Sequence, residues 1–553
     1  MVVEQFGLVR PVAVRTAAVT AVCGICAILL AHFRAERLIR LLTTGSIKPS
    51  ARESDTCSQK DEDSLQAEDA SPGDLEDLDA SAHEPRPEKL GRGEVLRKPR
   101  TVGSAAGHSV EDLTVVGDDS LLPGRQRIYV KTFGCPHNMS DGEYMMGQLR
   151  EYGYILVDSF EDCDALVVNS CTVKQPSEIR ALNLVTTAQE TGKPVVLAGC
   201  VPSSDRKLTD SLKGVSMLDV SQLDRIVDVV EESIKGHTVK LLSKRHDLPS
   251  LALPKIRKDR FAEVITINAG CLGNCTYCKT KMARGKVISY PIDEIIARAR
   301  QAASDGVCQI ELASEDMGAY GTDIGTNIAE LLLRLSDALP PGMMMRTGMT
   351  NPPFILEHID GVIEALKRPN VHSFMHIPVQ SGSDNVLASM RREYTVSEFE
   401  YLADKLKAAV PNIFLLTDII CAFPAESEED WQETMSLCRK YRFHGIHISQ
   451  FYARPGTPAA RMKPQKSHVG KDRYRELTDL TWTYDRNEGL AGREERVWFT
   501  GTNEEHDQTV GRTKAFAKIL VKRNDLLLGR NALVKFGETS RLHVLGEVLG
   551  DVR

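Results

Sequence analysis

The alternation of strand-like and helical segments between residues 261 and 453 restricts the fold of this chain most strongly. Six strand-like runs lie at 263–270, 309–315, 343–349, 373–380, 413–420 and 445–453. Helical stretches separate them, for example 292–304 and 397–409. Six consecutive βα units predict an open, partial version of the (β/α)8 barrel, in which the chemistry lies at the carboxyl ends of the strands.

Two further regions flank this predicted barrel. Upstream, strand-like runs at 127–134, 164–170 and 194–199 alternate with helical stretches at 141–152 and 176–191. This alternation predicts a doubly wound parallel sheet. Downstream, glycine-punctuated strand-like runs between 494 and 552 predict a small antiparallel β-barrel. The fold class is therefore α/β with several domains.

The first 124 residues differ in composition from the rest. An uncharged apolar run at 16–33 reaches the lower limit for spanning a bilayer. The positive flank is heavier on its carboxyl side, which predicts a location on the cytosolic face of a membrane, for which we expect the endoplasmic reticulum. An organelle transit or signal peptide and a buried helix are the alternatives. Residues 51–120 carry 18 acidic and 8 basic side chains, which predicts a disordered acidic linker.

These boundaries divide the chain into five expected segments. They are an anchor or targeting segment at 1–44, the linker at 45–124, an N-terminal domain at 125–248, the partial barrel at 249–489 and the C-terminal barrel at 490–553. The net charge is -7, of which -10 belongs to residues 51–120, so the remainder carries +3. A mildly basic folded part permits nucleic-acid binding without requiring it.

The strongest chemical signal is a cysteine triplet directly after the first barrel strand. Cys271, Cys275 and Cys278 lie on one short loop. Three thiolates can hold three irons of a [4Fe-4S] cluster, which leaves the fourth iron open to chelate S-adenosylmethionine (AdoMet). A zinc knuckle is the alternative, but zinc normally takes four ligands and no fourth Cys or His lies nearby.

A second triplet consists of Cys135, Cys171 and Cys200, each directly after a predicted parallel strand of the N-terminal sheet. The carboxyl ends of parallel strands share one edge of a sheet, so these cysteines can converge. Three ordinary buried cysteines are the alternative. The placement favours a second iron-sulfur cluster, and two open clusters suggest that one generates a radical while the other presents sulfur.

Several longer motifs resemble one family, the methylthiotransferases, which are radical AdoMet enzymes. The matching stretches are GCPHNMSDGE at 134–143, NSCTVK at 169–174, AGCVP at 198–202, GCLGNCTYCKTKMARG at 270–285, SEDMGAYGTDIG at 314–325, GMTNPP at 348–353, HIPVQSGSD at 376–384 and QFYARPGTPAA at 450–460. NSCTVK, CTYCKTK-x-ARG and GMTNPP resemble the eukaryotic and archaeal subfamily that acts on threonylcarbamoyladenosine in tRNA.

The resemblance implies two [4Fe-4S] clusters and AdoMet as both methyl donor and radical source. It implies conversion of N6-threonylcarbamoyladenosine, next to the anticodon of tRNA, into its 2-methylthio form. By the same resemblance, Cys135, Cys171 and Cys200 hold the auxiliary cluster, and Cys271, Cys275 and Cys278 hold the AdoMet-cleaving cluster. Ser314, Glu315 and Asp316 contact the AdoMet amino group, and the C-terminal segment is a tRNA-binding TRAM barrel. No catalytic side chain beyond the cluster ligands is implied.

Some positions depart from the family pattern or have more ordinary explanations. Ala422 and Ala425 stand where the family usually has glycine, and Met282 stands where histidine is usual. These departures leave the cluster ligands intact, and the sequence does not tell their effect on substrate positioning. A basic run beside the cluster loop either contacts tRNA or the AdoMet carboxylate or lies on a solvated face; it comprises Lys279, Lys281, Arg284 and Lys286. Histidines near the barrel strands are expected to be satisfied core residues; they are His372, His376, His444 and His447.

Two other functions fit parts of the sequence. The same chemistry directed at isopentenyladenosine in tRNA or at a ribosomal protein is one. A non-catalytic, membrane-tethered iron-sulfur binding protein is the other, although such a protein has no need of open iron sites. The sequence identifies neither the electron donor nor the sulfur source.

Overall fold

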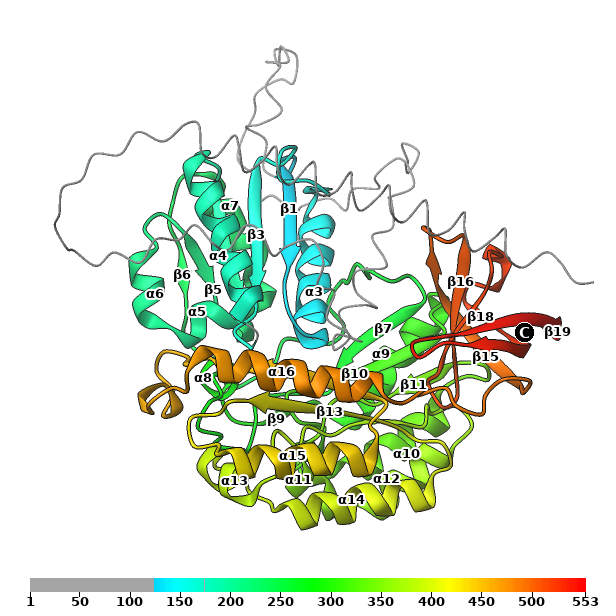
Figure 1. The fold of residues 1–553 in the computed structure, drawn as a ribbon. Helices are drawn as coiled ribbons and strands as arrows, with labels where there is room; N and C mark the ends of the chain where they lie inside the picture. The colour runs from blue at the N-terminus through cyan, green and yellow to red at the C-terminus, as the bar shows by residue number, and fades with distance from the viewer. Residues whose placement is uncertain (1–123, 174) are drawn as a thin grey trace, which may run out of the picture. The chain divides into compact units, whose positions relative to one another are not determined.

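A computed structural model describes residues 124–173 and 175–553. The first part of this region along the chain forms a six-stranded parallel sheet (Figure 1). The strand order is β2-β1-β3-β4-β5-β6. The strands are β1 (Arg127–Thr132), β2 (Ile155–Val157), β3 (Ala165–Ser170), β4 (Val195–Gly199), β5 (Ser216–Leu218) and β6 (Lys240–Leu241). The helices are α3 (Pro136–Tyr152), α4 (Gln175–Glu190), α5 (Cys200–Ser204), α6 (Arg206–Ser211), η2 (Val220–Arg225) and α7 (Ile226–Ile234).

Both faces of this sheet are covered by helices. In β3, Val167 packs into the core that includes α3 and α7, whereas its neighbours Leu166 and Val168 pack into a second core with α4. Successive side chains of a strand point to opposite faces, so a fully apolar strand needs a helix on each side. The predicted doubly wound sheet is confirmed.

Helix α3 begins five residues before the position that the sequence pattern indicated. Pro136 occupies the first turn and Cys135 is the N-cap residue. Proline suits this place because its fixed φ is helical and its missing N–H needs no partner there. Cys135 therefore lies at the junction of β1 and α3.

The central region is the predicted partial barrel of six parallel strands. They are β7 (Ala262–Thr266), β10 (Gln309–Ala313), β11 (Met344–Arg346), β12 (Phe374–His376), β13 (Phe414–Cys421) and β14 (Gly445–Gln450). They form two three-stranded sheets, β11-β10-β7 and β12-β13-β14, which an isolated parallel bridge between Met349 and His376 connects. A short antiparallel pair, β8 (Asn268–Ala269) and β9 (Ile288–Ser289), follows β7.

Helices cover the outer face of this partial barrel, with α10, α12, α14 and α15 side by side (Figure 1). The helices of this region are α8 (Thr280–Arg284), α9 (Ile292–Ser304), η3 (Met317–Ala319), α10 (Ile328–Ala338), α11 (Pro352–Leu356), α12 (Ile359–Lys367), α13 (Asp384–Met390), α14 (Val396–Ala409), α15 (Glu428–Tyr441), η4 (Ala459–Arg461) and α16 (Ser467–Trp482).

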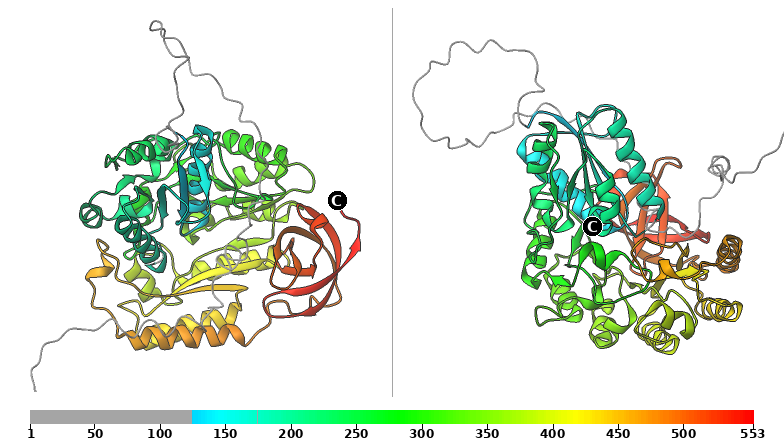
Figure 2. Two further views of the ribbon diagram at one scale, coloured as in Figure 1. Left: turned by 90° about the horizontal axis from the view of Figure 1, so that it is seen from above. Right: turned by 90° about the vertical axis from the view of Figure 1, so that its left-hand side faces the viewer.

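Helix α16 leads into a closed five-stranded C-terminal barrel (Figure 2). Its elements are β15 (Glu494–Asn503), β16 (Gln508–Thr513), β17 (Lys518–Lys522), η5 (Asp525–Leu527), β18 (Arg530–Thr539) and β19 (Val544–Gly550). Neighbouring strands are antiparallel except β17 and β19, which pair in parallel. Closure leaves no free strand edge, and the interior holds its own apolar core around Phe499 and Phe536.

An aromatic cluster fixes the C-terminal barrel to the start of β12. His372 is fully buried there, 5.2 Å from Phe516 and 6.4 Å from Trp498 by ring centroids. Its Nδ1 donates to the carbonyl of Thr513 at 3.0 Å, and its Nε2 has no hydrogen-bond partner among the described residues. Burial lowers the pKa of His372 to about 3. His372 is buried as expected, but it is only half satisfied.

His372 makes this contact sensitive to acid. Below its ordinary pKa of 6.5, the imidazole of His372 is protonated in the unfolded chain but stays neutral in the native chain down to about pH 3. The native state therefore loses stability as the pH falls. We expect His372→Asn, which retains a donor for Thr513 but does not titrate, to lose about 2 kcal/mol less stability than the parent between pH 7 and pH 5. Urea unfolding at both pH values measures the difference, and parallel pH profiles for the two proteins contradict it.

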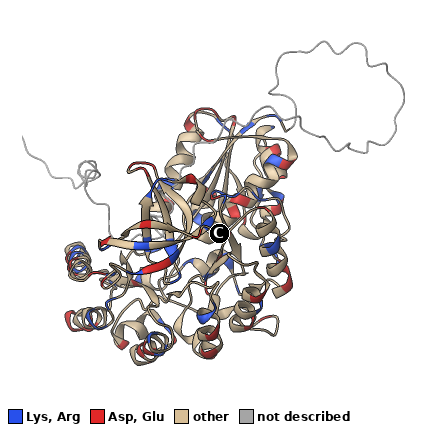
Figure 3. Ribbon diagram, turned by 90° about the vertical axis from the view of Figure 1, so that its right-hand side faces the viewer, with Lys and Arg blue, Asp and Glu red and all other residues tan. Residues whose placement is uncertain are grey.

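The predicted anchor at 1–44 and all of the predicted acidic linker except Gly124 lie outside the described residues. Among the described helices, none is both long enough and apolar enough to cross a bilayer. Lysines and arginines are interspersed with aspartates and glutamates along the described ribbon (Figure 3). The domain boundaries drawn from the sequence stay predictions.

Candidate active site

The first cysteine triplet lies on the loop between β8 and α8. All three cysteines are partly exposed. Gly270 has φ +86 and a Cβ there would collide with the carbonyl of Lys286, so the loop requires glycine. A Cβ built on Gly273 would lie 3.7 Å from the Sγ of Cys271 and 3.8 Å from that of Cys275. The missing side chain leaves space beside both sulfurs.

A partly buried arginine, Arg392, lies next to this loop. The Nη1 of Arg392 donates to the Sγ of Cys275 at 3.3 Å, and its Nη2 donates to Asn351 and to the carbonyl of Pro378. Burial raises the pKa of Cys271 to about 12, so a free thiol there resists ionisation. Iron binding requires thiolates, and the guanidinium of Arg392 lies against the sulfur of Cys275.

The second triplet lies at one edge of the N-terminal sheet, where three neighbouring strands end. Thr132, Asn169 and Ala198 are paired across β1, β3 and β4, and Cys135, Cys171 and Cys200 follow within three residues. The thiols of Cys135 and Cys171 are in hydrogen-bond contact, which with burial raises the pKa of Cys135. Strand order alone therefore brings together cysteines that are far apart in the sequence.

The backbone around this triplet is also restricted. Gly134 has φ +107, and a Cβ built on it would lie 2.6 Å from the Sγ of Cys171. Only glycine fits between the two cysteines. The thiol of Cys200 donates to the Oδ1 of Asn138 at 3.6 Å. The Nδ2 of Asn138 donates to the carbonyl of Ser170 at 2.9 Å.

The two cysteine loops are adjacent. Helix α5, which begins with Cys200, packs against α8, which follows Cys278. Lys279 is 1% exposed and pairs with Asp205 at 3.0 Å. The two triplets thus belong to one junction between the N-terminal sheet and the partial barrel.

Arg284 is the centre of this junction. Its guanidinium donates to Asn138 and Asp141 of α3, each at 2.6 Å, and pairs with Glu315 at 3.1 Å. His137 accepts from Arg284 at 2.6 Å and contacts Glu315 through Nδ1, also at 2.6 Å. The neutral tautomer with a proton on Nδ1 satisfies both contacts.

The expected exposed roles for the basic run are therefore wrong for two of its members. Arg284 and Lys279 are buried and paired, so neither lies on a solvated face or is free to contact tRNA. Lys281 donates to the carbonyl of Leu272 at 2.9 Å and supports the cluster loop. The one exposed member of the run is Lys286. No local signal in the sequence indicated this burial, because the partners of Lys279 and Arg284 lie far away in sequence.

Ser314, Glu315 and Asp316 follow β10 at the same end of the barrel. Glu315 accepts from the backbone N–H of Gly270 at 2.9 Å, at the start of the cluster loop. Asp316 accepts from the backbone and the amide of Asn351 at 3.0 and 2.8 Å, and Ser314 accepts from the Asp316 N–H at 2.8 Å. Glu315 thus connects the cluster loop to the Arg284 network. The predicted AdoMet contact of these three residues stays a prediction.

The residues present suit iron-sulfur clusters and a polar cofactor. Each triplet offers three thiols and leaves one iron of a cuboidal cluster without a protein ligand. Both amide atoms of Asn268, three residues before Cys271, are buried without a hydrogen-bond partner among the described residues. The Oγ1 of Thr266 is in the same situation. Buried polar atoms usually have partners, so unpaired ones beside the loop fit a site for a polar ligand.

Comparison with known proteins decides the family. The model of the Radical SAM superfamily matches residues 265–438, and that of Uncharacterized protein family UPF0004 matches 127–218. Threonylcarbamoyladenosine tRNA methylthiotransferase of Drosophila melanogaster is 47% identical over 79% of this chain and 80% of its own length. The chain belongs to the threonylcarbamoyladenosine tRNA methylthiotransferase family.

Vertebrate members of this family are similar to the same extent. The Homo sapiens protein is 46% identical over 79% of this chain and 76% of its own length. The Danio rerio protein is 45% identical over 81% of this chain and 83% of its own. The two family models coincide with the two parts of the chain that carry the cysteine triplets.

Two other features of the threonylcarbamoyladenosine methylthiotransferase barrel are separate from the cysteine loops. Asp418 accepts from His376 at 2.7 Å and from His447 at 2.9 Å, which confirms that both are hydrogen-bonded core histidines.

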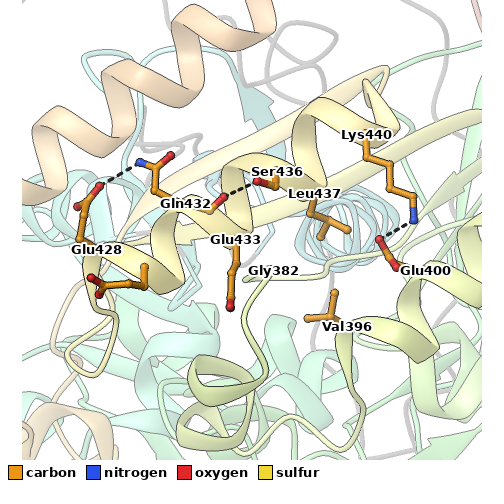
Figure 4. A pocket seen from close by; sticks show the side chains of 10 residues that line it. Gly382, Val396, Glu400, Glu428, Gln432, Glu433, Ser436, Leu437 and Lys440 are labelled. Atoms are coloured by element: carbon orange, nitrogen blue, oxygen red, sulfur yellow. Dashed lines mark hydrogen bonds and ion pairs between the residues drawn. The ribbon is translucent and has the colours of Figure 1, made fainter.

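Figure 4 shows a pocket on the outer helices, where Glu428 accepts from Gln432 and Glu400 pairs with Lys440 at 2.7 Å. This pocket contains none of the predicted site residues, so the junction remains the candidate site.

Ala422, one of the two alanines at positions where the family resemblance implied glycine, has φ +58. Left-handed backbone destabilises an alanine by about 1–2 kcal/mol. Glycine avoids this strain, but its greater conformational freedom in the unfolded chain cancels about half of the gain. We expect Ala422→Gly to raise the free energy of unfolding by about 0.5–1 kcal/mol, measured by urea denaturation. Ala425, which has no positive φ, is the matched control: Ala425→Gly gains nothing. Equal effects of the two substitutions contradict the assignment of strain to Ala422.

Proposed function

We propose that this chain transfers a methylthio group to C2 of N6-threonylcarbamoyladenosine, next to the anticodon in tRNA. The observation that carries the proposal is the adjacency of two three-cysteine loops at one domain junction, in a chain 47% identical to an enzyme named for this reaction. The enzyme class follows from the family, and the AdoMet-cleaving [4Fe-4S] cluster and AdoMet follow from the Radical SAM match.

The finer assignment of ligands is part of the proposal. Cys271, Cys275 and Cys278 hold the AdoMet-cleaving cluster, and Cys135, Cys171 and Cys200 hold a second [4Fe-4S] cluster. Together with AdoMet, such clusters supply a carbon-centred radical and a sulfur atom, which an unactivated C–H bond requires. The adjacency of the loops supports this division, because sulfur and radical must meet at one carbon of the substrate.

The protein's own side chains hold the junction in place. Arg284 neutralises the carboxylates of Asp141 and Glu315, and Arg392 supports Cys275. Lys279 and Asp205 connect the loops that carry Cys278 and Cys200. These contacts orient the two sets of ligands and exclude water. We assign no proton transfer to these side chains.

Nucleoside mass spectrometry tests the substrate. The anaerobically reconstituted, reduced chain is given AdoMet, a sulfide source and tRNA that carries either threonylcarbamoyladenosine or isopentenyladenosine. We expect the 2-methylthio product only from the first tRNA. Product from isopentenyladenosine alone would move the function to the related subfamily, and AdoMet cleavage without product from either tRNA would overturn the proposal.

The C-terminal barrel and the N-terminus complete the proposal. We assign the closed barrel to the tRNA-binding TRAM class, which its five-stranded closure supports. We also propose that residues 1–44 attach the enzyme to the cytosolic face of a membrane, for which the charge bias around 16–33 is the support. A fluorescent fusion with and without 1–44 tests this, and an unchanged distribution contradicts it.

A further inference from the structure

Three arginines surround one tyrosine where α16 passes into the C-terminal barrel. Arg442 follows α15, Arg486 lies in the connection after α16, and Arg541 lies in the turn between β18 and β19. All three act electrostatically on Tyr484, and the Arg442 guanidinium lies 5.3 Å from its ring centroid. We call these three residues the arginine cluster. The left view of Figure 2 shows α16 leading into the barrel at this place.

No member of the arginine cluster forms an ion pair within residues 124–173 and 175–553. The Nε of Arg486 and both Nε and Nη1 of Arg541 are buried without hydrogen-bond partners there. One protein hydrogen bond is present at Arg541, from Nη2 to Thr481 at 2.8 Å. The neighbouring carboxylate of Asp485 accepts instead from the backbone of Asn487 at 2.8 Å.

Three buried arginines elsewhere in this chain are paired with carboxylates. Arg284 pairs with Asp141 at 2.6 Å, Arg298 with Glu263 at 3.0 Å and Arg473 with Glu426 at 2.5 Å. In the arginine cluster, burial lowers the pKa of Arg486, and burial together with Arg486 lowers the pKa of Arg541 to about 10. Arg486 and Arg541 are partly buried, and unpaired like charges at such places are unfavourable unless an anion joins them.

The geometry beside these arginines indicates which anion. Trp482 is 55% exposed, and the guanidinium of Arg541 lies 3.7 Å from its ring centroid. Stacked arginine and exposed tryptophan together form a surface on which nucleic acids bind, since the guanidinium fork matches phosphate and the ring accepts a base or sugar. The amide of Asn487 donates to Ser540 at 2.7 Å and holds the connection against the β18–β19 turn.

We propose that the arginine cluster and Trp482 form a phosphate-binding site for the tRNA backbone. The inference rests on the proposed function for the identity of the RNA. Arg442 precedes β14, so the site lies toward the amino ends of the barrel strands, whereas the cysteine loops follow strand carboxyl ends. A bound tRNA therefore has a second anchor remote from the nucleotide that reacts.

Binding of tRNA to the full chain at several salt concentrations tests the site. We expect the double variant Arg486→Gln/Arg541→Gln to bind about tenfold more weakly, with a salt slope smaller by about 1, because one backbone phosphate loses its partners. Trp482→Leu weakens binding without changing the slope. The matched control is Arg523→Gln in the same barrel, since Arg523 already pairs with Glu504 at 2.8 Å. It leaves affinity and slope unchanged.

Thermal unfolding without RNA separates binding from folding. Removing two like charges leaves the melting temperature unchanged or raised, whereas a structural role for the pair predicts a fall. Unchanged tRNA affinity in the double variant overturns the inference. Binding of inorganic phosphate that the double variant loses while its tRNA affinity stays at the parent value overturns it as well. If the chain binds tRNA through these residues yet forms no methylthio product, the proposed function fails and this inference stands.

Discussion

Replacing Cys275 by alanine is expected to abolish AdoMet cleavage, whereas replacing Cys171 is expected to abolish only sulfur insertion. In the first variant neither 5'-deoxyadenosine nor methylthiolated nucleoside forms. In the second, 5'-deoxyadenosine still forms on reduction, but the methylthio product falls to background. The two triplets lie on separate parts of the chain, so a substitution in one triplet leaves the three cysteines of the other in place.

The two products are quantified in the same anaerobic reaction by liquid chromatography and mass spectrometry. Cys163→Ala is the matched control, because Cys163 is a buried cysteine of the same N-terminal sheet region that lies outside both triplets. It retains both products. A Cys171 variant that still makes product at the parent rate would show that Cys135, Cys171 and Cys200 do not hold the sulfur-presenting cluster.

The second large effect is expected at Arg284. Arg284→Met leaves Asp141 and Glu315 buried without their common cation, and removing one partner of a buried pair costs about 3–5 kcal/mol. The apparent free energy of unfolding falls by that amount, and both products fall because the two loops separate. Chemical denaturation and the product assay measure the two effects.

Arg334→Gln serves as the control for Arg284, since Arg334 pairs with Asp293 on the surface, where its side chain is 46% exposed. A surface pair contributes little, so this variant stays within about 0.5 kcal/mol of the parent. Arg284→Lys retains the charge but loses the fork, and we expect an intermediate effect. A loss at Arg284 no larger than at Arg334 would contradict the role given to the junction.

The sequence pattern predicted the features that depend on local rules. The periodicity of strands and helices predicted the parallel sheet, the partial barrel and the small C-terminal barrel. The position of Cys135, Cys171 and Cys200 directly after strands was enough to place them at one sheet edge, because parallel strands end together. The spacing of Cys271, Cys275 and Cys278 predicted their shared loop.

Features that depend on distant contacts could not be predicted in this way. Arg284 and Asp141 are 143 residues apart in sequence, so a basic run beside the cysteines gave no sign of a buried network. The short strands β2, β5 and β6 have three or fewer residues and no distinct periodicity, and they were missed. The unpaired arginines are brought together by the close approach of α15, the connection after α16 and the β18–β19 turn.

The most direct test of the central claim, two clusters held by two cysteine triplets, is the iron and sulfide content of the chain after anaerobic reconstitution. Two [4Fe-4S] clusters predict about eight irons and about eight sulfides per chain, and about four of each in the Cys135/Cys171/Cys200 triple-alanine variant. About four irons in the unsubstituted chain, unchanged in that variant, would contradict the account.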